Sequence, residues 1–183
     1  MELNIEQINL LQQGNAAMQK QVFEKLFSTM FRVCQRYIVR TDEAEDCVMK
    51  GFLKAFKQMD QFQYQGVNSF TFWLKRIMVT ESLMALRKQH NFHLVAVEQI
   101  PDIEFDDTQL QQIDAAYLYD AILTLPSGYR TVFNLFVIEG YTHQEIAKQL
   151  GISESTSKTQ LAKAKQKLQQ LLTQQQYGYG NGR

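Results

Sequence analysis

Apolar residues recur at intervals of three and four along most of this 183-residue chain. Residues 17–39 show the pattern most clearly, because Val22, Leu26, Met30 and Tyr37 fall on one side of a helix with about 3.6 residues per turn. Such a side has to be buried against another element. The chain has only two prolines, and no alternating runs flank a tight turn. The sequence therefore predicts an all-α fold.

Glycine, asparagine and polar loop residues separate the expected helices. These helices cover residues 5–13, 17–39, 43–59, 70–88, 115–123, 127–139, 142–149 and 154–172. Thr41 or Asp42 suits the N-cap of the third helix, since a short oxygen-bearing side chain can accept from the free N–H groups there. The expected buried stripe of 127–139 comprises Val132, Phe133, Phe136 and Val137.

Charged residues are segregated along the chain, although Lys+Arg and Asp+Glu both total 19. Bases exceed acids in 20–88 and in 121–183, whereas 89–120 has seven acids and no Lys or Arg. This pattern is typical of two polyanion-binding modules and a linker that polyanions repel. We expect two small helical domains at 1–90 and 115–173, an acidic linker at 91–114 and a disordered tail at 174–183. The linker is either a solvated spacer or a segment that enters a cationic channel.

The residues that build metal and catalytic sites are scarce. Cys34 and Cys47 lack the CxxC spacing of a zinc site or redox pair, and both are expected to be reduced thiols. His90, His93 and His143 are not grouped with acids or cysteines, and no glycine-rich loop could cradle a phosphate. We therefore expect no metal, no cofactor, no small-molecule substrate and no enzymatic activity. Without a signal peptide or an apolar run of about 18 residues, the chain is expected to be cytoplasmic.

Residues 142–161 have the form of a helix-turn-helix. Thr142 and Glu145 make a capping box at the start of the first helix, and Gly151 falls where that helix has to end in a left-handed turn. Ser153 then caps a second helix. The N-terminal turns of this helix would read the edges of DNA bases, and its lysines would hold phosphates. Ser157, Lys158 and Gln160 are the candidates for base edges. The full set of expected DNA contacts is Ser155, Thr156, Ser157, Lys158, Gln160, Lys163 and Lys165, with Lys167 as a further phosphate contact.

Residues 125–168 closely resemble region 4 of bacterial sigma factors of the sigma-70 family. The shared elements are Leu125-Pro126, Tyr129-Arg130, the Glu-Ile-Ala core of the first helix and the Thr-x-Lys start of the second. Response regulators of the LuxR type have a similar helix-turn-helix, so this half alone leaves both families open. The N-terminal half decides between them. Residues 43–57 and Phe70-x-x-Trp73-Leu74-x-x-Ile77 resemble regions 2.2 to 2.4 of the extracytoplasmic-function (ECF) sigma factors, and 86–88 match the end of that block.

The resemblance implies a protein that binds core RNA polymerase, directs it to a promoter and opens the −10 element. In the family, the loop before the Trp-Leu helix takes up an unpaired base, and here that loop is about 61–69. Unpaired bases need aromatic surfaces beside a basic rail. Trp73 falls on the apolar side of its helix and is expected in the core. The expected −10 contacts are Tyr64, Asn68, Phe72, Lys75, Arg76, Thr80, Arg87 and Lys88.

The family's main polymerase contact lies on the region 2.2 helix. The residues that carry over by position and helical spacing are Asp46, Met49, Lys50, Leu53 and Lys57. The resemblance also implies promoter DNA as a partner and, as is common in the family, a membrane-bound anti-sigma factor. Three other classes of protein fit the sequence less well. A stand-alone helix-turn-helix regulator explains 125–172 but not 43–88, an enzyme lacks its site residues, and a pure interaction module is already contained in the sigma reading.

Overall fold

The computed structural model describes residues 3–88 and 115–180, and within these ranges the chain is helical with no strand. The predicted all-α class is confirmed. The first segment contains α1 (Ile5–Gln12), α2 (Ala16–Gln35), α3 (Thr41–Lys57), the 3₁₀ turn η1 (Met59–Gln61) and α4 (Ser69–Lys88). The second contains α6 (Ala115–Thr124), α7 (Ser127–Phe133), the π-helical turn η2 (Asn134–Ile138), α8 (His143–Leu150) and α9 (Glu154–Gly180). The chain divides into two compact units, Met1–Asn91 and Phe92–Arg183.

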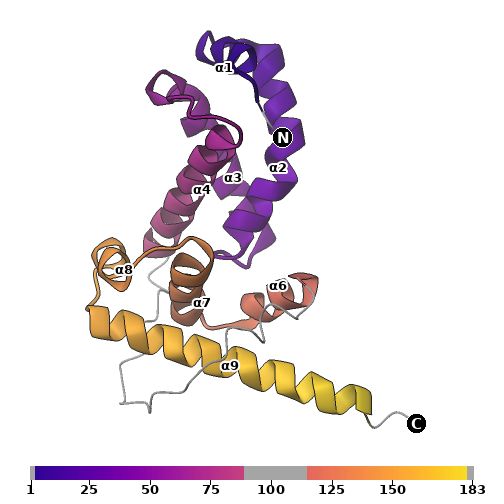
Figure 1. Ribbon diagram of the computed structural model, residues 1–183, viewed down its shortest axis with the longest axis vertical. Coiled ribbons are helices and arrows are strands. Elements are labelled where there is room, and N and C mark those ends of the chain that lie inside the picture. Colours follow the sequence, from indigo (N-terminus) through magenta and orange to yellow (C-terminus); the bar gives the residue numbers. More distant parts are fainter. Residues whose placement is uncertain (1–2, 89–114, 181–183) are drawn as a thin grey trace. The chain divides into compact units, whose positions relative to one another are not determined.

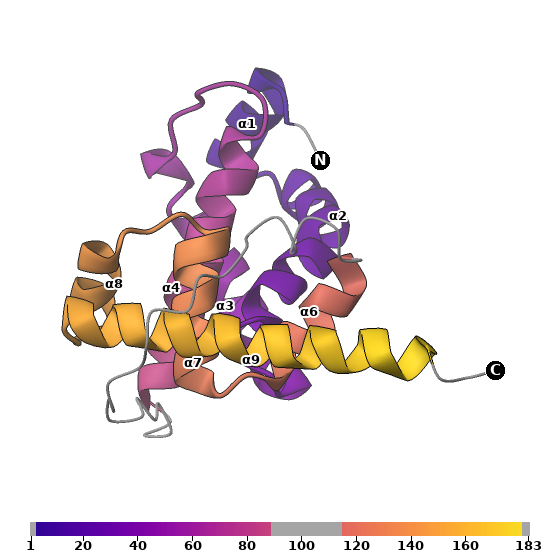
Figure 2. The same cartoon turned by 60° about the horizontal axis from the view of Figure 1, so that its bottom comes forward.

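In the first unit, α2, α3 and α4 pack against one another (Figures 1 and 2). Their facing sides supply fully buried residues such as Val22 of α2, Val48 of α3 and Leu74 of α4. The crossing of α3 and α4 is very close at Gly51, where an added Cβ would overlap the thioether of Met78. A side chain at this position would therefore force the two helices to shift or Met78 to repack.

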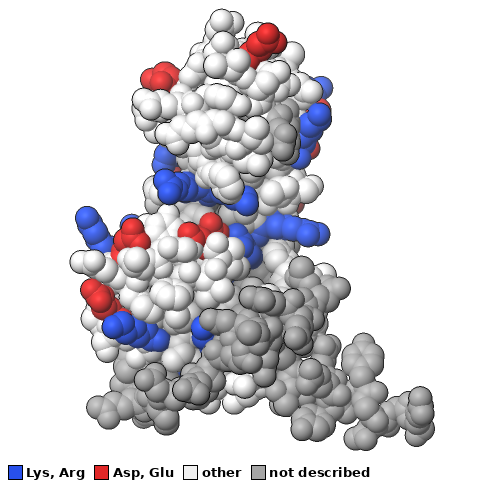
Figure 3. Space-filling view, viewed as in Figure 1, with Lys and Arg blue, Asp and Glu red and all other residues white. Residues whose placement is uncertain are grey.

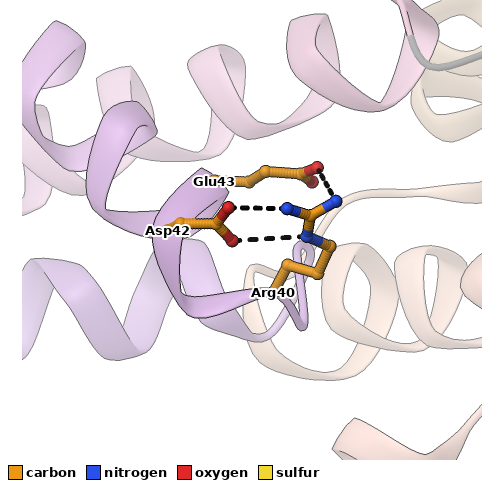
Figure 4. Close-up of polar contacts among 3 residues, drawn as sticks. All are labelled: Arg40, Asp42 and Glu43. Atoms are coloured by element: carbon orange, nitrogen blue, oxygen red, sulfur yellow. Dashed lines mark hydrogen bonds and ion pairs between the residues drawn. The ribbon is translucent and has the colours of Figure 1, made fainter.

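The start of α3 differs from the prediction, because the N-cap is Arg40 rather than Thr41 or Asp42, and the Arg40 side chain accepts no cap hydrogen bond. The carboxylate of Asp42 instead accepts from Arg40, with Nη2 at 2.6 Å and Nε at 3.3 Å. The third guanidinium nitrogen, Nη1, lies 3.3 Å from Oε1 of Glu43 (Figure 4). This exposed pairing, above all the hydrogen bond from Arg40, lowers the pKa of Asp42. Asp42 therefore pairs with Arg40, the residue directly before the helix, instead of capping it. Its negative charge, like that of Glu43, also stabilises the positive N-terminal end of the helix dipole.

Helix α2 also ends earlier than predicted, at Gln35 instead of residue 39. The N–H of Tyr37 donates to the carbonyl of Cys34, which tightens the last turn. Tyr37 and Ile38 are nevertheless buried. The sequence predicted both residues as part of the helix, but they are buried from the turn that follows it.

In the second unit, α7 and α8 pack against α9, which is drawn as one long helix in both views (Figures 1 and 2). The predicted helix 127–139 changes at Asn134 into a π-helical turn that closes with Glu139 N–H donating to Asn134. The wider turn rotates the side chains, so that Val137, predicted to be buried, is 40% exposed. The buried guanidinium of Arg130 donates to the carbonyls of Leu123 and Leu125 and thereby fixes the joint between α6 and α7.

The backbone of α9 is helical as far as Gly180, whereas the sequence placed the end of this helix at residue 172 and a disordered tail from 174. The additional turns begin with a run of glutamines, which are good helix formers. For 174–180 the structure therefore corrects the expectation of an irregular tail. The predicted acidic linker, 91–114, lies outside the described residues.

Candidate nucleic-acid interface

The turn between α8 and α9 has the geometry that the sequence predicted. The Thr142 hydroxyl accepts from the N–H of Glu145 at 3.2 Å, and the Glu145 carboxylate accepts from the N–H of Thr142 at 2.8 Å. Gly151 has φ 69° and ψ 37°, which is the left-handed conformation that ends α8. The Ser153 hydroxyl then accepts from the N–H of Thr156 at 3.0 Å and caps α9. Two capped helices joined by a left-handed glycine form a helix-turn-helix.

The recognition helix α9 presents only part of the predicted set to the outside. Ser155 and Lys158 are exposed, and Thr156, Lys163 and Lys165 are half-buried. Ser157 and Gln160 are 0% and 1% exposed, so the prediction that these two reach base edges is wrong. The reason is helical spacing. Ser157 lies four residues before Leu161 and Gln160 lies four residues before Ala164, and Leu161 and Ala164 belong to the buried side of α9.

His143, the first residue of α8, holds the buried side of the recognition helix. Its Nδ1 lies 2.9 Å from the Ser157 hydroxyl, and its ring stacks on Phe136 with centroids 4.4 Å apart. Burial lowers the pKa of His143, and the charge of Lys158 lowers it further, against a smaller opposite effect of Glu154. A neutral imidazole therefore ties α8 to α9. The sequence reading found no role for His143, and only its contact with Ser157 reveals one.

The second candidate surface is the loop between η1 and α4. The Phe62 ring is buried against Phe70 and Trp73, with centroid distances of 5.6 and 5.2 Å. Trp73 itself is half-buried and packs on Phe62 and Phe70, so it borders the core where the sequence predicted it within the core. At the tip of the loop, Tyr64 is 37% exposed and Asn68 has a positive φ of 69°. The loop is thus anchored on an aromatic cluster and exposes a ring and an amide.

The outer side of α4 continues from this loop as a row with four-residue spacing. The row consists of Phe72, Arg76, Thr80, Met84 and Lys88, all of them exposed. Phe72 is the most open, at 61%, and Lys75 places its ammonium 5.8 Å from the centre of the Phe72 ring. Arg87 is exposed beside the end of the row. Met84 is not among the predicted −10 contacts. Its exposure between Thr80 and Lys88 makes it a further candidate.

A third surface lies on α3. The residues predicted to contact polymerase, Asp46, Met49, Lys50, Leu53 and Lys57, are all exposed and follow one side of the helix. Met49 and Leu53 are 46% and 58% exposed, although the opposite side of α3 is fully packed. The Lys50 ammonium lies 3.5 Å from the Asp46 carboxylate. Exposed apolar side chains framed by charged ones are typical of a protein interface.

Bases and acids are interspersed on the faces of the two units that Figure 3 presents, so neither face is uniformly basic. Both cysteines are free, as predicted, and both are buried. Burial raises the pKa of the Cys34 thiol to about 12. Of the described helices, none is long and apolar enough to cross a membrane. Among the same residues, no group of three or more His, Cys, Asp or Glu side chains could hold a metal ion.

A helix-turn-helix in one helical unit and an aromatic and basic helix side in the other define a DNA-binding protein with two modules. Comparison with known families agrees with this class. Residues 22–92 match the family model "Sigma-70 region 2", and residues 115–168 match "Sigma-70, region 4". The two matches together span more than half of the chain, in the order of the family.

Two curated relatives give the same result. The ECF RNA polymerase sigma factor SigM of Mycobacterium tuberculosis is 26% identical over 152 residues, which is 83% of this chain and 76% of that protein. SigW of Bacillus subtilis, also an ECF sigma factor, is 24% identical over 156 residues, covering 78% and 82%. A solved structure of the sigma factor RpoE with the anti-sigma factor NepR from Bartonella quintana is 23% identical, with a TM-score of 0.49 over 84% of this chain and 96% of that chain.

The chain belongs to the sigma-70 family, and it is a sigma factor of the ECF group. It binds RNA polymerase and directs it to promoters in the initiation of transcription. The sigma prediction, drawn from the order of two separate blocks, is confirmed.

Proposed function

We propose that the three surfaces divide the work of initiation among themselves. The exposed side of α3 binds core RNA polymerase, the loop before α4 together with the outer row of α4 opens and reads the −10 element, and the outer side of α9 reads the −35 element. The chain acts as a regulatory subunit and not as an enzyme, and it works in the bacterial cytoplasm, where promoter and polymerase meet. An anti-sigma partner stays a prediction from the resemblance.

The observation that carries this proposal is the exposed row on α4. Phe72 offers an open ring beside Lys75, and Arg76 follows one turn later. Strand opening needs such stacking surfaces, because an unpaired nucleobase is held mainly through its flat face. Basic side chains beside these surfaces neutralise the phosphates of the strand. The ring of Phe72 is 61% exposed and is therefore open for stacking.

The polymerase arm of the proposal is tested first, since it requires no promoter sequence. The purified protein is mixed with bacterial core polymerase that lacks any sigma factor and is run on gel filtration. We expect co-elution, and we expect Leu53→Asp to weaken it strongly because the substitution places a charge in the centre of the proposed apolar contact. Ile5→Asp is the matched control, since Ile5 of α1 is 58% exposed, as is Leu53.

Two results would overturn the assignment. If the folded wild-type protein does not co-elute with a cognate core, the polymerase role fails, and tight promoter binding by the free chain would then favour a stand-alone regulator. If Leu53→Asp and Ile5→Asp behave alike, polymerase is bound elsewhere than on α3.

A further inference from the structure

Gln12, the last residue of α1, reaches across to the turn that precedes the promoter-reading loop. Its Nε2 donates to the carbonyl of Met59 at 3.2 Å and to the carbonyl of Phe62 at 3.1 Å. Met59 opens η1, and Phe62 follows that turn as the first residue of the loop. One side-chain amide thus fixes both ends of a single turn, 47 and 50 residues away along the chain.

The helix that carries Gln12 is itself firmly placed. Asn4 and Gln7 form a capping box at its start, and Ile8 and Leu11 are buried. Contacts of α1 are made with α2 and with η1. The amide of Gln12 is therefore presented from a rigid element and not from a mobile terminus.

The opposite end of the loop is also tied. The Ser69 hydroxyl donates to the carbonyl of Gly66 at 2.7 Å and accepts from the N–H of Gln65 at 3.3 Å. Between the two anchored ends, Tyr64 and Val67 are exposed. The loop is thus held at both ends and open at its tip.

We infer that Gln12 is a positioning residue for promoter opening, which presents the tip of this loop to an unpaired base. The inference rests on the proposed function, and it adds a residue of α1, a helix that lies before the segment 22–92 matched to region 2. By fixing the stem of the loop in the free protein, the two hydrogen bonds reduce the conformational entropy that base capture would otherwise cost. A loop that holds the captured base in one arrangement should discriminate more strongly among the four bases at that promoter position.

Two variants and a control separate positioning from general stability. Gln12→Met keeps the length of the side chain but has no donor, and Gln12→Glu turns an acceptor toward two carbonyls. Gln13→Met is the matched control, since Gln13 is an exposed glutamine next in sequence. In the free protein, we expect Gln12→Met to speed hydrogen exchange of the bonded amides of Phe62, Gln65 and Ser69 about threefold to tenfold, and exchange within α3 to stay unchanged.

The second measurement uses the holoenzyme with core polymerase and a pool of duplexes randomised over the promoter, from which bound and opened DNA is sequenced. Wild type and Gln13→Met are expected to select one −10 sequence. Both Gln12 variants should bind core normally and flatten the preference at one or more −10 positions, with the −35 preference kept.

The outcomes are distinct. A flattened −10 preference with faster loop exchange supports the inference. An unchanged preference in Gln12→Met, or unchanged loop exchange, overturns it and leaves the proposed function intact. If the wild-type holoenzyme selects no −10 sequence, the proposed reading of the loop fails and the inference fails with it.

Discussion

The ammonium group of Lys54 lies 2.8 Å from Oε1 of Glu81, and this ion pair joins α3 to α4 inside the first unit. The side chain of Glu81 is only 13% exposed, and that of Lys54 is 37% exposed. Lys54 belongs to the stretch of α3 that resembles region 2.2, but its partner lies within the bundle. Its role is to set α4 on α3, while its neighbours Leu53 and Lys57 face outward.

Replacing Lys54 with Met should lower the free energy of unfolding of the first unit by about 1–2 kcal/mol. A nearly buried carboxylate would lose its partner, but the partial exposure of Lys54 keeps the loss below that of a fully buried pair. The exchange Lys54→Glu with Glu81→Lys should restore much of the loss. Denaturant unfolding followed through Trp73, the single tryptophan of the chain, measures it. Lys57→Met is the control, and an equal effect there would remove the ion pair as the cause.

Gly51→Ala should also destabilise the first unit, by about 1–2 kcal/mol, because the new methyl group overlaps the buried Met78 side chain. The gain in helix propensity offsets only part of this cost. A smaller residue at position 78 makes room, so Met78→Ala should cost less stability in the Gly51→Ala background than in the wild type. Additive effects of the two substitutions would show that the overlap is relieved elsewhere in the bundle.

Much of the architecture was predictable because apolar periodicity and cap residues are local signals. The capping box of Thr142, the left-handed Gly151 and the Ser153 cap all formed where the sequence placed them. The α3 positions that carry over from the family resemblance are all exposed. The contacts made by these surfaces with DNA and polymerase remain predictions.

The failures come from side-chain contacts that apolar periodicity and cap preferences do not reveal. Ser157 was expected on the DNA-facing side of α9, but its spacing from Leu161 and its contact with His143 put it on the buried side. Arg40 replaces a predicted side-chain cap by binding Asp42 from outside the helix. Gln12 could not be linked to the loop, because its hydrogen bonds join residues that are far apart in sequence.

Stability of the second unit should fall as the pH is lowered below about 6.5, the ordinary pKa of histidine. The pKa of His143 is lowered in the folded state by burial and by Lys158, so the unfolded chain takes up a proton that the folded chain resists. The loss of stability caused by His143 is therefore absent well above pH 6.5, and it grows as the pH falls from there toward the folded pKa. The groups facing the ring are Phe136, Ser157, Lys158 and Glu154.

An imidazole NMR titration between about pH 5 and pH 8 checks the direction of the shift. The resonance that disappears in His143→Asn belongs to this ring. In the same variant, the part of the pH dependence of unfolding that His143 causes should vanish. A midpoint at or above the ordinary value would contradict the prediction.

Ser157 and Lys158 are neighbours on α9 with opposite environments, and their alanine variants should separate stability from recognition. Ser157→Ala leaves the Nδ1 of His143 without its partner and should cost about 1 kcal/mol of folding stability, with the −35 preference unchanged. Lys158→Ala removes an exposed base and should weaken holoenzyme binding to the preferred −35 sequence by about 1–3 kcal/mol, with little effect on stability.

Binding of holoenzyme to duplexes with single substitutions in the −35 element distinguishes two roles for Lys158. A loss confined to the preferred sequence identifies a base contact, whereas an equal loss on every sequence identifies a phosphate contact, with a weaker salt dependence. For Ser157→Ala, a changed base preference at unchanged stability would return the hydroxyl to the DNA-facing side of α9. The buried contact with His143 predicts the reverse, because a side chain enclosed between α8 and α9 can reach a base only after the two helices separate.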